Sequence, residues 1–172
     1  MKLDELLVVA AAQWPHKRAL IFPESELTFS NLHANAKRKA RSLIGAGVRA
    51  GDHVGILSLN LPEYVEAIFA INMAGATAVP LNARYRGAEL KQVIADSDIR
   101  LLFTTSQFDG RVDFSAHLTD CYPELSTALN PRQLRIGEAP LLKSVVMFET
   151  TQKLGFISST DFEQWGRDVT DE

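Results

Sequence analysis

Short apolar runs alternate with segments of helical periodicity through the middle of the chain. The runs at residues 54–59, 77–81 and 100–104 have the length of buried strands. The segments between them, residues 62–74 and 88–96, carry apolar side chains at helical spacing. An order of strand, helix, strand, helix, strand favours parallel pairing through right-handed crossovers. We therefore predict an α/β fold with a parallel, doubly wound sheet, incomplete within this chain.

The residues before this region predict a helix, two short strands and a second, longer helix. A short amphipathic helix at Leu3–Gln13 is followed by two short strands, the first at residues 19–22. The clearest helix of the chain covers residues 28–44, with Thr28 as its N-cap and glycines at its end. We predict three parts: a lead-in at residues 1–50, a βαβαβ core at 51–150 and a terminal segment at 151–172.

Composition excludes several classes of protein. The net charge of -3 gives no sign of a nucleic-acid partner. No apolar stretch approaches the roughly 20 residues that span a bilayer, so we expect no integral membrane segment. The single cysteine, Cys121, excludes an intramolecular disulfide and fits a reducing cytoplasm. We interpret it as a packed side chain rather than a nucleophile.

The familiar catalytic and phosphate-binding motifs are missing from the sequence. The glycines at 45, 47 and 51 follow a helix and precede a strand, whereas a dinucleotide loop does the reverse, so we interpret them as a helix end and a turn. The four histidines are scattered, with no metal-ligand spacing, and no nucleophile elbow exists. The basic run at residues 37–41 is either a solvated helix face or an anion-binding patch.

One candidate ligand contact lies beyond the strand at 100–104. The stretch TTSQFDGR, residues 104–111, follows the carboxyl end of that strand, where ligands gather in open α/β sheets. Arg111 in this stretch could hold a phosphate with its fixed fork of donors. A surface arginine without a ligand is the alternative.

Five short motifs, in order and at the right spacing, resemble those of adenylate-forming acyl-CoA synthetases and ligases. The segments LTFSNL at 27–32 and AGATAVPLN at 74–82 are similar to the family's first two shared motifs. Between them, GDHVGI at 51–56 resembles a strand entry, and NLPE at 60–63 resembles a helix start. The segment LNARYR at 81–86 looks like the acyl-CoA ligase branch.

The resemblance implies an ATP-dependent enzyme that uses Mg and CoA. A carboxylic acid would attack ATP to give an acyl-adenylate and pyrophosphate, and the CoA thiol would then displace AMP. No position of this chain matches the family's ATP loop, magnesium motif or catalytic lysine, so no catalytic residue or metal ligand is assigned. The one residue that the resemblance assigns to a ligand is Arg111, which lies near the position of an arginine that contacts the CoA phosphate in some members of the family.

We therefore expect an N-terminal portion of a larger ligase, inactive by itself and without a cofactor of its own. Its partners would be the remainder of the enzyme and, there, the carboxylic acid, ATP and CoA. An incomplete sheet should also expose apolar surface, so we expect self-association. Two alternatives stay open: a stand-alone assembly or regulatory module, and a generic flavodoxin-like nucleotide binder.

Overall fold

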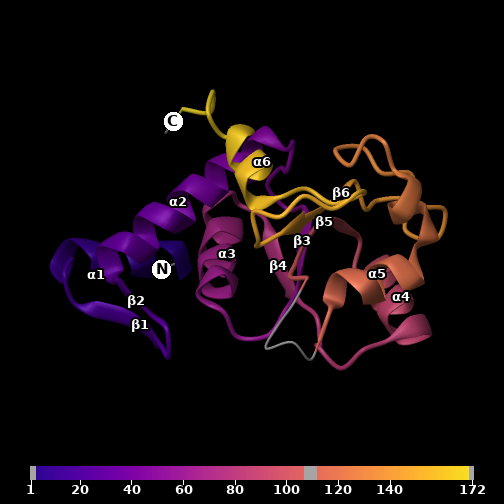
Figure 1. The fold of residues 1–172 in the computed structure, drawn as a ribbon. Helices are drawn as coiled ribbons and strands as arrows, with labels where there is room; N and C mark the ends of the chain where they lie inside the picture. The colour runs from indigo at the N-terminus through magenta and orange to yellow at the C-terminus, as the bar shows by residue number, and fades with distance from the viewer. Residues whose placement is uncertain (1–2, 107–111, 171–172) are drawn as a thin grey trace.

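Four parallel strands form the central sheet of the computed structural model, which describes residues 3–106 and 112–170. The strands are β3 (His53–Leu57), β4 (Thr77–Pro80), β5 (Ile99–Thr104) and β6 (Ser144–Met147). Their spatial order is β4-β3-β5-β6, and every neighbouring pair runs parallel (Figure 1). The prediction of an α/β fold with a parallel sheet is confirmed.

Helices cover both faces of this sheet, so it is doubly wound. Helix α3 (Pro62–Met73) connects β3 to β4, and α4 (Gly87–Asp96) connects β4 to β5. Helix α5 (Phe114–Cys121) and the 3₁₀ helix Pro123–Thr127 lie between β5 and β6. Helices α4 and α5 pack on one face, while α3 and the short α6 (Ser159–Gln164) pack on the other.

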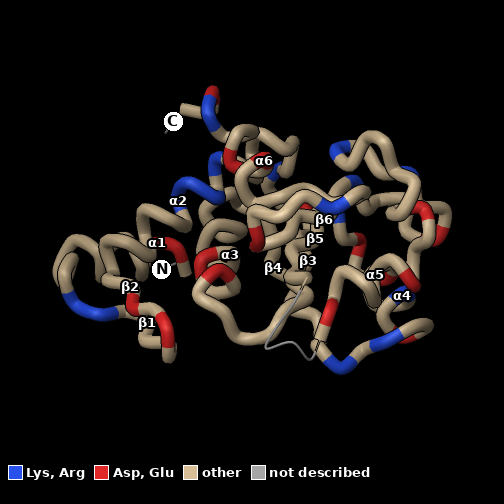
Figure 2. The backbone as a smooth tube through the Cα atoms, in the orientation of Figure 1, with Lys and Arg blue, Asp and Glu red and all other residues tan. Residues whose placement is uncertain are grey.

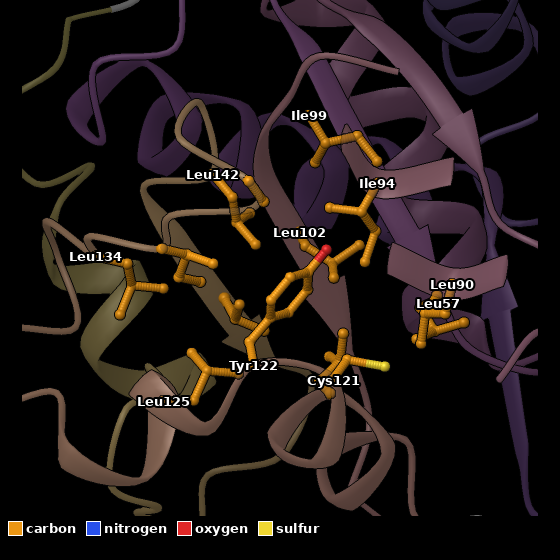
Figure 3. Close-up of a cluster of buried hydrophobic side chains, with 14 of the residues drawn as sticks. Leu57, Leu90, Ile94, Ile99, Leu102, Cys121, Tyr122, Leu125, Leu134 and Leu142 are labelled. Carbon is orange, nitrogen blue, oxygen red and sulfur yellow. The ribbon is translucent and has the colours of Figure 1, made fainter. Parts of the chain in front are cut away.

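The two cores follow from the alternation of side chains along each strand. Along β5, Leu101 and Phe103 point toward α3 and α6, whereas Leu102 points toward α4 and α5. Figure 3 shows the core on the side of α4 and α5, where the Tyr122 ring lies among aliphatic side chains from strands, helices and loop. Each fully buried aliphatic side chain contributes about 1.5–3 kcal/mol to stability.

The N-terminal elements form a small layer in which α1 (Leu3–Gln13) and α2 (Phe29–Gly45) pack against α3. Helix α1 and the antiparallel hairpin of β1 (Arg18–Phe22) and β2 (Ser25–Thr28) pack beside α2. In Figure 1 they lie at the opposite end of the molecule from α4 and α5. Thr28 caps α2 as predicted, because its hydroxyl accepts a hydrogen bond from the backbone N–H of Asn31 at 3.2 Å.

Lys39, in the basic run of α2 (Figure 2), is buried rather than solvated. Its ammonium donates to Glu66 of α3 at 2.6 Å, and both side chains are almost fully buried. The amide of Asn35 donates to the other Glu66 oxygen, also at 2.6 Å. Both carboxylate oxygens therefore have partners, and this network joins α2 to α3 away from water.

Most element boundaries agree with the sequence-based expectation to within one or two residues. Strand β3 ends at Leu57 rather than at residue 59. Helix α5 begins at Phe114 and continues to Cys121. Helix α6 begins at Ser159, because the Ser158 hydroxyl caps it by accepting from the Asp161 N–H at 3.2 Å.

Among the residues that the structure describes, no helix combines the length and apolarity required to cross a membrane.

Candidate functional site

The carboxyl ends of the four parallel strands define the candidate site. From β3 the chain moves outward to β4, then returns past β3 to form β5 and β6 on the other side. The direction of winding therefore reverses between β3 and β5. Crevices beyond the carboxyl ends at such a reversal are where open α/β sheets bind ligands.

Two buried hydroxyl groups at this edge donate to backbone carbonyls. The Thr104 hydroxyl donates to the Leu57 carbonyl at 3.0 Å, which joins the last residues of β5 and β3. The Ser58 hydroxyl donates to the Leu59 carbonyl, also at 3.0 Å. Thr104 and Ser58 are buried, so these two hydroxyls serve the scaffold.

Glu149 is the most unusual polar group at this edge. It follows β6, and its Oε1 accepts from the backbone N–H of Ser106 at 2.9 Å and from the Thr105 hydroxyl. These bonds tie the chain after β6 to the chain after β5. The second oxygen, Oε2, is shielded from water and has no hydrogen-bond donor in the described part of the chain. The sequence patterns did not single out Glu149, although it is the first charged residue after a buried strand.

A second polar cluster lies where α5 begins. Asp113 caps this helix by accepting from the Ala116 N–H at 2.9 Å and from the Ser115 hydroxyl at 2.6 Å. The Lys153 ammonium donates to the Ser115 hydroxyl at 2.5 Å and lies 4.0 Å from Asp113. Burial alone would raise the pKa of Asp113, but the hydrogen bonds from Ser115 and Ala116 and the charge of Lys153 together lower it.

A histidine of this helix lies close to an arginine. The pKa of His117 on α5 is lowered, first by burial and then by the positive charge of Arg86. The Arg86 guanidinium lies 5.9 Å from the centre of the Phe114 ring, within reach of a cation–π contact. The surroundings of α5 therefore favour neutral imidazole and ionised Asp113.

The sequence-based candidates have different outcomes. Arg111, the proposed CoA-phosphate contact, lies outside the described residues. Cys121 is buried, and burial raises the pKa of its thiol, so it packs as expected. Gly47 and Gly51 adopt φ angles of 85° and 87° in the turns between α2 and β3, as the helix-end interpretation requires.

The described part of the chain offers a framework for a site rather than a complete one. Within residues 3–106 and 112–170, no group of three or more His, Cys, Asp or Glu side chains could hold a metal ion. The polar side chains at the carboxyl edge bond mainly to backbone and to one another. Among the described residues, the buried Glu149 Oε2 is the acceptor at this edge for which no donor is present.

Comparison with known proteins gives the context of this framework. The family model described as AMP-binding enzyme matches residues 7–159. The chain is 31% identical over 147 residues to the acyl-CoA ligase sidI of Aspergillus fumigatus, covering 84% of this chain and 23% of that protein. It is 32% identical over 147 residues to the 2-succinylbenzoate–CoA ligase of Oceanobacillus iheyensis, covering 85% of this chain and 29% of that protein.

Solved structures share the same architecture. The anthranilate CoA ligase AuaEII, determined in complex with anthranoyl-AMP, superposes with a TM-score of 0.77 at 26% identity. That match covers 97% of this chain and 28% of the ligase. The chain thus spans less than a third of the length of these relatives.

Proposed function

Because the chain belongs to the family of AMP-binding enzymes, we propose that it forms the N-terminal part of an ATP-dependent carboxylic acid–CoA ligase. The observation that carries this proposal is the family match over residues 7–159, together with similarity to proteins named as CoA ligases. The reaction would have two steps. The carboxylate attacks the α-phosphate of ATP to give acyl-adenylate and pyrophosphate, and the CoA thiol then displaces AMP.

In this proposal the chain supplies scaffold and one wall of the ligand-binding region. Its parallel sheet presents a carboxyl edge, where Glu149 Oε2 has no donor among the described residues and the pKa of Asp113 is lowered. The chemistry itself would come from segments that the relatives have beyond the matched length. Magnesium, which the resemblance implies, would be bound there as well. The buried, unpaired Cys121 fits a cytoplasmic location.

An exposed apolar groove favours a second candidate, an assembly module that pairs with the rest of a ligase in trans. The groove has a volume of about 530 Å³ and lies between α1, β1 and the neighbouring faces of α2 and α3. Large apolar side chains of α1 and the following turn remain 40–52% exposed; they are Leu3, Leu6, Val8, Val9 and Trp14. Such a surface is typical of a site that another segment or protein covers.

Calorimetric titration of the purified chain with ATP–magnesium and with CoA tests the proposed function. We expect no saturable binding of ATP, because its phosphate loop is not in this chain. The longer protein should catalyse acid-dependent exchange of pyrophosphate into ATP, and the chain alone should not. Saturable one-to-one ATP binding by the chain would instead support a nucleotide-binding module and contradict the scaffold role.

The apolar groove also predicts self-association of the isolated chain. Light scattering should show an average mass that rises with protein concentration. Replacing Leu6 and Val9 by serine should reduce that rise, because it removes exposed apolar area from α1. Replacing Leu154, which is 57% exposed on a distant loop, is the matched control. A monomer at high concentration would refute the prediction.

A further inference from the structure

We draw no further inference here: the strongest candidate, the apolar groove that α1 and β1 form with the neighbouring faces of α2 and α3, carries no proposal because nothing in the structure shows what covers it.

Discussion

Removing the Lys39 ammonium should destabilise the chain far more than removing an arginine from a surface ion pair. The Lys39 Nζ lies 2.6 Å from the Glu66 Oε2, and the two side chains are only 11% and 6% exposed. In a Lys39→Met variant, Glu66 keeps the hydrogen bond from Asn35 but loses its counter-charge. A buried charge left without its partner costs about 3–5 kcal/mol.

A cost of this size is a large fraction of the total stability of about 5–15 kcal/mol that is typical of native proteins. Urea unfolding followed by circular dichroism would measure it as a lower midpoint at an unchanged slope. The double variant Lys39→Met/Glu66→Leu should recover most of the loss, because it replaces both charges with apolar side chains of similar volume. The difference between the single and double variants then gives the coupling between the two residues.

Arg18→Met provides the matched control. Arg18 also pairs with a carboxylate, that of Glu26 at 3.0 Å, but the two side chains are 61% and 51% exposed. Its loss should cost about 0–1 kcal/mol, as for other solvated ion pairs. If Lys39→Met costs no more than Arg18→Met, then water reaches Glu66 and our reasoning about burial is refuted.

Three further predictions concern the loop after β6 and helix α5. An alanine Cβ at Gly155, where φ is 80°, would lie 1.9 Å from the Leu125 carbonyl oxygen, so Gly155→Ala should cost about 2–5 kcal/mol in a urea titration, whereas Gly137→Ala, with open space around it, should cost little. Asp113→Ala should lower stability at pH 7 by about 0.5–2 kcal/mol through loss of the cap. Because the folded pKa of Asp113 is lowered from 3.8, its ionic stabilisation is present above that value and lost as the pH falls below it, so thermal unfolding of wild type and variant should converge in acid. The Cys121 thiol is buried and its pKa is raised, so it should react with an aromatic disulfide reagent only when urea unfolds the chain. Rapid reaction in native buffer would contradict its burial.

Local patterns in the sequence were enough to predict the order of strands and helices. The bounds of α1 agree with the prediction, and Thr28 caps α2 as its position suggested. These features depend on neighbours within a few residues, which the sequence displays directly. The doubly wound topology followed as well, because parallel crossovers leave few alternatives.

Contacts between distant residues could not be predicted in the same way. Glu149 gains its importance from Ser106, which reaches it only after β5 and β6 have paired. Lys39 was grouped with its basic neighbours, although it lies three residues after Ala36 and four before Leu43, on the buried stripe of α2. Helical spacing was the available signal, but the identity of its partner on α3 required the fold.

The pairing of β3 has a consequence for the order of events during synthesis. Strand β3 is central, with β4 on one side and β5 on the other, yet β4 precedes β5 in the chain. Until Ile99–Thr104 has left the ribosome, one edge of β3 has no native neighbour, and its backbone groups are open to pairing with other strands. Translation through α4 is therefore an interval in which the nascent chain is exposed to aggregation.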